Sequence, residues 1–156
     1  MDIVIQRVKE AKVRVNEVIV GEIQTGFLLL VGFSQDDELG LTRADLEKIS
    51  RKILKLRCFS DLEGKMNLNL EQVEGKILAV SQFTLLGDLK KGNRPSFMKA
   101  LRPDLANDYF KLFCETLRED VVVEEGRFGE DMQVELINDG PVTFVINSNN
   151  ILGSQR

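Results

Sequence analysis

Apolar and polar residues alternate along the first part of the chain with the period of two that is typical of β-strands. Residues 2–20 follow this pattern, interrupted at Asn16-Glu17, a pair that is typical of a tight reversal. Residues 27–33 then form a continuous apolar run that begins after Gly26. Its short length and the preceding glycine favour a strand buried on both faces over a helix. We therefore expect three strands at the start of the chain.

A helical period replaces this alternation over residues 42–57. Thr42 stands before the first apolar position and Asp45 follows three residues later, which is the pattern of a capping box. We predict an amphipathic helix here, with a basic second half. A solvated surface is the simpler interpretation of that basic face, and a nucleic-acid contact is the alternative. The apolar positions of this helix are Leu46, Ile49, Ile53 and Leu56.

The middle of the chain mixes predicted strands and helices. Residues 77–83 and 121–123 have strand composition, and Pro103 is well placed in the first turn of a helix. Pro95 is expected to open a short helix that ends near Arg102. Strands group towards both ends of the chain, with helices between them and no regular βαβ alternation. This order predicts a mixed α+β domain built on antiparallel sheet.

The last two predicted strands flank Gly140-Pro141. Residues 132–136 alternate up to this dipeptide, and residues 142–147 form a strand after it. Proline cannot donate a hydrogen bond to a strand ladder, so it belongs at the start or edge of a strand. One interpretation is a plain turn in a hairpin-like pair, and the other is a cis peptide whose carbonyls face a ligand. Only roughly 5–6% of X-Pro bonds are cis, so the local sequence leaves both open.

The composition fits one soluble domain. The chain has 156 residues, of which 43% are apolar and 29% are charged, as in an ordinary globular protein. No apolar run approaches the ~20 residues that span a bilayer, and the N-terminus lacks the pattern of a secretory signal. We therefore expect a cytoplasmic protein without a membrane segment. The net charge of −4 disfavours broad nucleic-acid binding but allows a local basic patch.

Histidine is absent from the chain, which excludes Ser-His and Cys-His pairs and His-ligated metals. Cys58 and Cys114 have no paired spacing, so we expect no metal site and no cofactor. Hydroxyl residues Ser81 and Thr84 cluster where an apolar strand ends. A hydroxyl is a weak nucleophile without a neighbouring base, so a nucleophilic Thr84 is only an alternative. The backbone amides of Phe83 and Thr84 could instead bind an oxyanion.

Several segments resemble the signature motifs of the D-aminoacyl-tRNA deacylase family, and together they cover nearly the whole chain. Residues 148–156 lie outside the resemblance. We expect a single deacylase domain over residues 1–147 and a polar, disordered tail over residues 148–156. The two main motifs are Ser81-Gln82-Phe83-Thr84-Leu85 and Asn138-Asp139-Gly140-Pro141-Val142-Thr143, and residues 5–8, 64–69, 93–97 and 126–128 with Met132 also match in order.

This resemblance implies a mainly antiparallel, barrel-like α+β fold with two to three helices packed outside. It also implies a homodimer with two active sites at the subunit interface. Ser81, Gln82, Phe83 and Thr84 would be the catalytic segment that floors the pocket. The substrate-binding residues would be a cis Gly140-Pro141 bond from the partner, Arg7 orienting that bond, and Phe128 and Met132 against the terminal adenine of the tRNA.

The implied substrate is the ester between a D-amino acid and the ribose of the 3′-terminal adenosine. The ribose 2′-hydroxyl would assist the attacking water, and the Gly140-Pro141 carbonyls would exclude L-amino acids but not glycine. We expect the acceptor stem of the tRNA to contact a basic cluster. Two alternatives remain: a tRNA-binding dimer without catalysis, and a hydrolase of another ester with a Thr84 nucleophile. The basic cluster is Lys90, Lys91, Arg94, Lys99 and Arg102.

Overall fold

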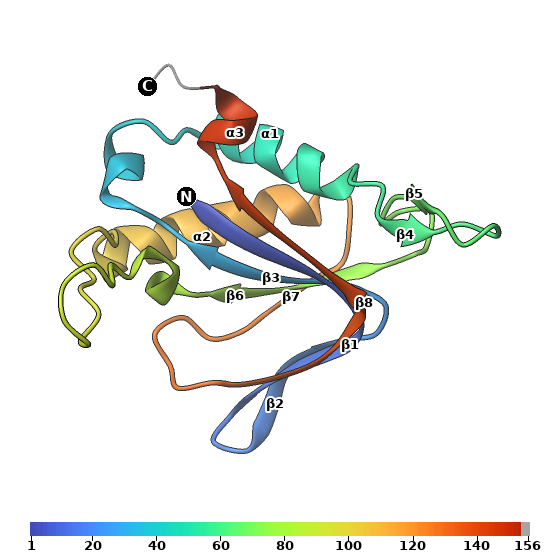
Figure 1. Cartoon of the computed structure of the whole chain (residues 1–156), viewed down its shortest axis with the longest axis horizontal. Helices are drawn as coiled ribbons and strands as arrows, with labels where there is room; N and C mark the ends of the chain where they lie inside the picture. Colours follow the sequence, from blue (N-terminus) through green and yellow to red (C-terminus); the bar gives the residue numbers. More distant parts are fainter. Residues whose placement is uncertain (154–156) are drawn as a thin grey trace.

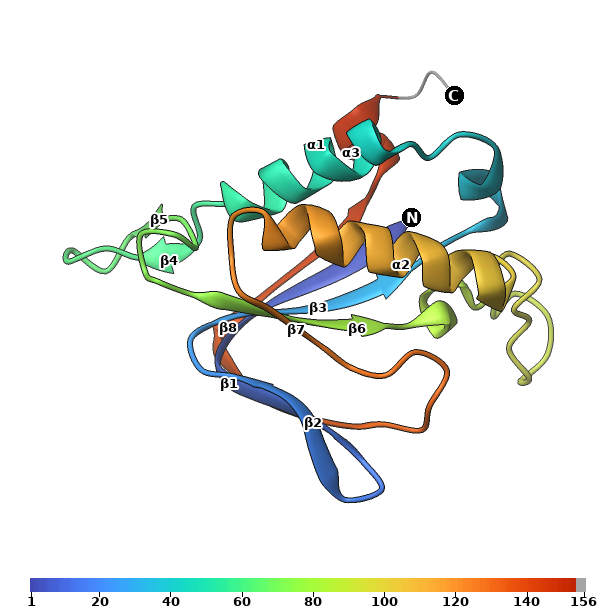
Figure 2. The same ribbon diagram turned by 180° about the vertical axis from the view of Figure 1, so that it is seen from behind.

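The structure is a computed structural model, and it describes residues 1–153. Helices α1 (Arg43–Leu54), α2 (Pro103–Arg118) and α3 (Asn149–Leu152) all lie on one side of a strongly curved sheet (Figure 1). The same arrangement seen from behind shows the opposite end of the sheet curling away from the helices towards β2 (Figure 2). Among residues 1–153, no helix is both long and apolar enough to cross a membrane.

Six strands within residues 1–153 form one mixed sheet. The central strand β1 pairs antiparallel with three neighbours, whereas β3–β6 and β6–β7 are parallel pairs. The parallel pairs arise because α1 and α2 each provide a long crossover between successive strands. The sheet strands are β1 (Asp2–Val15), β2 (Val18–Ile23), β3 (Gly26–Gly32), β6 (Lys76–Ser81), β7 (Val123–Glu125) and β8 (Gln133–Asn147), and β4 (Phe59–Ser60) with β5 (Met66–Leu68) forms a separate small ribbon.

The sheet nearly closes into a barrel because β1 is bent. Its first half pairs with β3 and its second half with β2, and its register shifts at three places against β2 and β8. Such irregularities increase local twist and curl the sheet. A Cβ on Gly21 of β2 would lie 2.8 Å from the Glu125 carbonyl oxygen of β7, so glycine allows the two strands to approach closely. The predicted barrel-like α+β architecture is confirmed.

Two apolar cores lie on the two faces of this sheet. Phe27 and Leu29 of β3 pack on the helix side, whereas Leu28 between them packs inside the barrel. This explains the continuous apolar run of β3 and confirms the predicted strand buried on both faces. The helix-side core includes Phe110 and Phe113 of α2, both almost fully buried.

The helix ends follow the predicted signals. Thr42 accepts a hydrogen bond from the Asp45 amide, and Asp45 Oδ2 accepts one from the Thr42 amide at 2.8 Å. Pro103 occupies the first turn of α2. The prediction of a short helix from Pro95 to Arg102 is wrong, because the structure has no helix over these residues. Backbone amides in this segment pair across to Asp88 and Phe33 instead, so long-range contacts override the local proline signal.

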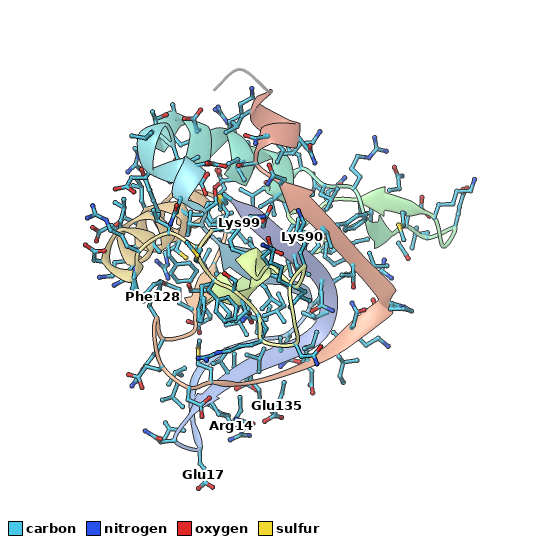
Figure 3. The ribbon with its side chains drawn as sticks, turned by 60° about the vertical axis from the view of Figure 1, so that its left-hand side comes forward. Arg14, Glu17, Lys90, Lys99, Phe128 and Glu135 are labelled. Carbon is cyan, nitrogen blue, oxygen red and sulfur yellow. The ribbon has the colours of Figure 1, made fainter. Side chains whose placement is uncertain are left out.

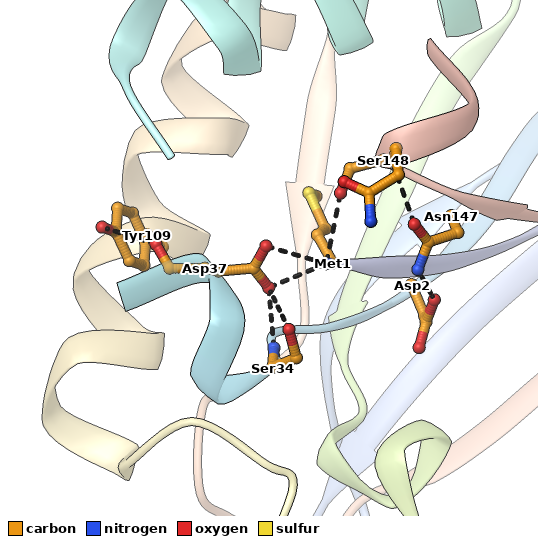
Figure 4. Close-up of polar contacts among 8 residues, drawn as sticks. Met1, Asp2, Ser34, Asp37, Tyr109, Asn147 and Ser148 are labelled. Carbon is orange, nitrogen blue, oxygen red and sulfur yellow. Dashed lines mark hydrogen bonds and ion pairs between the residues drawn. The ribbon is translucent and has the colours of Figure 1, made fainter. Parts of the chain in front are cut away.

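The first part of the tail that was predicted to be disordered is instead ordered, because it forms α3 and packs against the N-terminus. Ser148 is buried, and its amide donates to the Met1 carbonyl at 2.9 Å. The Met1 ammonium lies 2.7 Å from Asp37 Oδ2 and also donates to the Ser148 hydroxyl. Both contacts are drawn as dashed lines in Figure 4. These contacts lie far apart in sequence and fix the start of α3. The last three residues of the predicted tail lie outside the described residues.

Candidate active site

A pocket of about 590 Å³ opens at the carboxyl end of β6. It lies between the loop of residues 87–100 and the loop of residues 126–132, which flank the same end of the molecule (Figure 1). The carboxyl ends of parallel strands are common ligand sites, because loops there can surround a ligand on a rigid base. The pocket is lined in part by the predicted site residues Ser81, Gln82, Phe83, Phe128 and Met132.

The pocket floor is formed where β6 ends. The Gln82 amide donates to the Val31 carbonyl at 2.8 Å, and Phe83–Leu86 then forms one turn of 3₁₀ helix. The amides of Phe83 and Thr84 are the first two of this turn, so the turn itself supplies no acceptor for them. Two adjacent amides of this kind can bind an oxyanion.

The Thr84 hydroxyl lies beside the pocket floor but does not line the pocket. Its oxygen accepts a hydrogen bond from Gln82 Nε2. A carboxamide cannot accept a proton from a hydroxyl at neutral pH, so this contact orients Thr84 without activating it as a nucleophile. The geometry therefore points to the backbone of this segment, rather than its hydroxyl groups, as the chemically useful part.

Aromatic side chains form the walls of the pocket. The rings of Phe83 and Phe97 meet edge to face with centroids 5.1 Å apart. Phe128 lies on the opposite loop (Figure 3). Its ring centroid is 6.4 Å from that of Phe110 of α2. Met132 lines the pocket on the same side. Flat apolar walls of this kind suit a planar ring such as a nucleobase.

The second predicted cluster surrounds Gly140-Pro141, and the peptide bond between them is cis. The interpretation of this dipeptide as a plain turn in a hairpin-like pair is wrong, because β8 continues through it and pairs with β1 on both sides of it. Gly140 has a φ of +129°, and a Cβ there would lie 2.7 Å from Val142 Cγ2. This position therefore requires glycine. Both residues of the dipeptide are exposed in the single chain.

The side chains of Arg7 and Asn138 hold the Gly140-Pro141 segment through hydrogen bonds to backbone carbonyls. Arg7 is buried, and its Nε donates to the Asp139 carbonyl at 3.0 Å while its Nη1 donates to the Cys58 carbonyl at 2.6 Å. Asn138 Nδ2 donates to the carbonyls of Arg7 and Val142, both at 2.9 Å. The Gly140-Pro141 backbone is thus displayed on a rigid, hydrogen-bonded support.

The two predicted clusters lie apart within one chain. Arg7, beside Gly140-Pro141, is level with Ile77 across β1, β3 and β6. Ser81 lies four residues further along β6, which corresponds to about 13 Å at 3.3 Å per residue. The strand spacing across the sheet adds to this separation. Accordingly, Gly140-Pro141 does not line the pocket of its own chain.

Several pocket residues were not predicted from the sequence as site residues. Phe97 belongs to the matched segment of residues 93–97, which was a signal that could have identified it. Arg102 was predicted only as part of the basic cluster, and it lines the pocket on the side of the basic loop. Glu130 and Asp131, which were not predicted, line the opposite side. Their role depends on the folded arrangement of two loops, which no local sequence pattern shows.

Other reactive groups lie away from the pocket lining. Burial raises the pKa of the Cys58 and Cys114 thiols, which keeps both protonated at neutral pH. Within residues 1–153, no cluster of three or more potential Asp, Glu or Cys metal ligands occurs. The basic cluster predicted from sequence lies along the loop of residues 87–102, and Figure 3 shows Lys90 and Lys99 within it.

Comparisons with known proteins agree with this architecture. The chain shares 38% identity with a structure titled c-Myc DNA Unwinding Element Binding Protein, over 94% of this chain and 98% of that one, with a TM-score of 0.84. A probable eukaryotic D-amino acid tRNA deacylase shares the fold at 20% identity and a TM-score of 0.80, over 93% of this chain and 97% of that one. The sequence model of the family described as D-Tyr-tRNA(Tyr) deacylase matches residues 4–147. The chain therefore belongs to the D-Tyr-tRNA(Tyr) deacylase family and is a hydrolase of D-aminoacyl-tRNA.

Proposed function

We propose that the chain hydrolyses the ester bond of D-aminoacyl-tRNA in sites that two copies of the chain build together. The products are a free D-amino acid and tRNA, and the enzyme works in the cytoplasm as a homodimer. The observation that supports this most directly is the separation of the two site clusters. One chain has a pocket with a backbone floor at Ser81–Thr84 and carries its rigid, exposed Gly140-Pro141 segment elsewhere.

A dimer with a two-fold axis would bring the two clusters together from different chains. In an isologous dimer each chain offers the same two surfaces, so the Gly140-Pro141 segment of each copy can enter the pocket of the other. The support of this segment by Arg7 and Asn138 suits such a role, because a group that must fit a neighbour's site gains from being held in place before contact. The dimer is thus part of the catalytic unit.

The reaction needs few ionisable groups from the protein. A water molecule attacks the ester carbonyl, a tetrahedral oxyanion forms, and the ribose 3′-oxygen leaves with a proton. The adjacent ribose 2′-hydroxyl orients the water and passes the proton. The amides of Phe83 and Thr84 stabilise the oxyanion, an effect of roughly 3–4 kcal/mol per donor in other enzymes. This mechanism is compatible with a chain that has no histidine.

Chirality is selected by exclusion. The carbonyls of Gly140 and Pro141 from the partner accept hydrogen bonds from the α-ammonium of the substrate. An L side chain would then point into this rigid backbone, whereas a D side chain points towards solvent. Glycine has no side chain to exclude, so glycyl-tRNA is also cleaved. The site rejects one configuration without recognising side-chain identity.

The tRNA is bound through its terminal adenosine and its acceptor stem. Phe128 and Met132 pack against the adenine, and the Lys90, Lys91, Arg94, Lys99 and Arg102 cluster contacts phosphates of the acceptor stem. The 38% identical relative carries a title that describes binding to a DNA element, which is a property of that protein. For this chain, the predicted contact is local, since the net charge of −4 disfavours a broad nucleic-acid surface.

A direct experiment compares four substrates: D-tyrosyl-, L-tyrosyl-, glycyl- and L-alanyl-tRNA. We expect rapid release of tyrosine from the D-ester and of glycine, with both L-esters protected by at least about a hundredfold in kcat/KM, because the rigid Gly140-Pro141 backbone rejects the L configuration sterically. Equal rates for D- and L-tyrosyl-tRNA would contradict the proposal. Equal protection of glycyl- and L-alanyl-tRNA would contradict the exclusion mechanism but not the deacylase activity itself.

A further inference from the structure

The loop that carries the basic cluster is anchored at one residue. Residues 89–99 are all exposed, whereas the Asp88 side chain is only 26% exposed. The Asp88 amide donates to the Ser96 carbonyl at 2.8 Å, and the Ser96 amide donates back to the Asp88 carbonyl at 3.0 Å. This isolated pair of backbone bonds closes the base of the segment of residues 89–95, which we call the basic arm.

The Asp88 carboxylate fixes the arm at two further points. Its Oδ1 accepts the Lys90 amide at 2.9 Å, which starts the turn into the arm. Its Oδ2 forms an ion pair with Lys99 Nζ at 3.1 Å, which ties the turn to the chain beyond the arm. The Lys90 amide first, and Lys99 second, lower the pKa of Asp88, so the carboxylate stays charged at neutral pH.

The chain after the arm is held independently of Asp88. The Gln35 amide donates to the Lys99 carbonyl at 2.9 Å, and the Leu101 amide donates to the Phe33 carbonyl at 2.9 Å. Phe97 packs against Phe83 at the pocket wall. Loosening the arm would therefore leave the pocket and its backbone floor in place, and would affect the arm that bears Lys90, Lys91 and Arg94.

We propose that Asp88 is a positioning residue that holds the basic arm ready for the phosphates of the tRNA acceptor stem. This inference rests on the proposed function and deepens it. A mobile cationic loop must lose conformational freedom when it binds, whereas an ordered loop has already lost it. Although it carries a negative charge beside a polyanion, Asp88 thus strengthens RNA binding.

The sign of one substitution separates this role from simple electrostatics. Asp88→Ala removes a negative charge, releases Lys99 and removes the acceptor of the Lys90 amide, which asparagine would keep. Charge alone predicts tighter tRNA binding for this variant. Loss of the ordered arm predicts weaker binding, with a rise of about tenfold in KM and kcat unchanged within about twofold. Asp36→Ala is the matched control. Asp36 is exposed on the neighbouring 3₁₀ turn (Gln35–Leu39), and its change removes the same charge without touching the arm.

Two measurements on the full-length protein test the proposal. The first is tryptic cleavage after Lys90 and Lys91, which reports the mobility of the arm whether or not the protein is a deacylase. The second is the KM and kcat for D-tyrosyl-tRNA. We expect Asp88→Ala to be cleaved faster and to show the raised KM, with Asp36→Ala matching the unmodified chain in both assays.

An unchanged cleavage rate, or a KM that stays the same or falls in Asp88→Ala, would overturn the role of Asp88. Inactivity of the unmodified chain towards D-tyrosyl-tRNA, with faster cleavage of the variant, would instead reject the proposed function. A thermal melt of each variant ensures that the comparison is made on folded protein.

Discussion

The pocket floor depends more on backbone than on side chains. Ser81 and Gln82 line the pocket, and the 3₁₀ turn that follows begins with the amides of Phe83 and Thr84, for which the turn itself supplies no acceptor. The Thr84 hydroxyl accepts a hydrogen bond from the Gln82 carboxamide, which has no basic character. At this scale, the chemistry proposed for the site depends on amide positions that most side-chain substitutions would leave intact.

Thr84→Ala tests whether a side-chain nucleophile is involved. Removal of the hydroxyl should lower kcat by less than about tenfold, because the amide of residue 84 is retained and only the contact to Gln82 is lost. The measurement is single-turnover hydrolysis of D-tyrosyl-tRNA. Complete loss of activity in a folded Thr84→Ala protein would favour the nucleophilic alternative.

At the scale of elements, the support of Gly140-Pro141 comes from two long strands. Arg7 of β1 reaches the Asp139 carbonyl of β8 and, on its other side, the Cys58 carbonyl just before β4. Asn138 ties β8 back to β1 through the Arg7 carbonyl. This bracing connects the exposed dipeptide to the buried Arg7 side chain of β1 and to the chain at the buried Cys58.

Arg7→Met should therefore impair both stability and activity. It leaves the carbonyls of Cys58 and Asp139 without their donor, and we expect a loss of roughly 3 kcal/mol in the free energy of unfolding. Deacylation should fall in parallel, since the Gly140-Pro141 support is lost. Urea denaturation and a D-tyrosyl-tRNA assay measure the two effects.

Arg14→Met on the same strand is the matched control. Arg14 bonds Glu135 at 2.7 Å on the surface, and this hydrogen bond is the main reason that the pKa of Glu135 is lowered (Figure 3). Exposed ion pairs contribute little to stability, so this variant should unfold and react almost as the unmodified chain does. Equal effects of the two substitutions would contradict the supporting role of Arg7.

Most elements could be predicted from the sequence because their signals are local. The period of two in β1, the capping box at Thr42 and the proline at the start of α2 each match the structure. Three features could not be predicted in this way. The extended chain near Pro95, the path of β8 through Gly140-Pro141 and the packing of Ser148 all depend on partners distant in sequence.

The candidate site shows the same division. The motifs around Ser81 and Gly140 could be identified from the chain, but their separation in the monomer depends on the register of β1, β3 and β6. The wall residues Phe97, Arg102 and Glu130 meet only when two loops fold around the end of β6. Sequence thus indicated the parts of the site, while the sheet determined which parts one chain can bring together.

At the scale of the whole molecule, the account requires that each site combine two copies of the chain. Gly140→Ala alters the Gly140-Pro141 segment and leaves the pocket open, since the added Cβ meets Val142 and Arg7. Ala100→Trp fills the pocket and leaves Gly140-Pro141 intact, since Ala100 lines the pocket. Neither variant alone should hydrolyse D-tyrosyl-tRNA at an appreciable rate.

The most direct test is to co-express these two inactive chains and assay the mixture. A mixed dimer has one site with an open pocket and an unaltered Gly140-Pro141 segment from its neighbour. We therefore predict recovery of roughly a quarter of the unmodified activity, because half of the dimers are mixed and each has one intact site of two. No recovery, with mixed dimers verified by two-tag purification, would contradict a site shared between subunits.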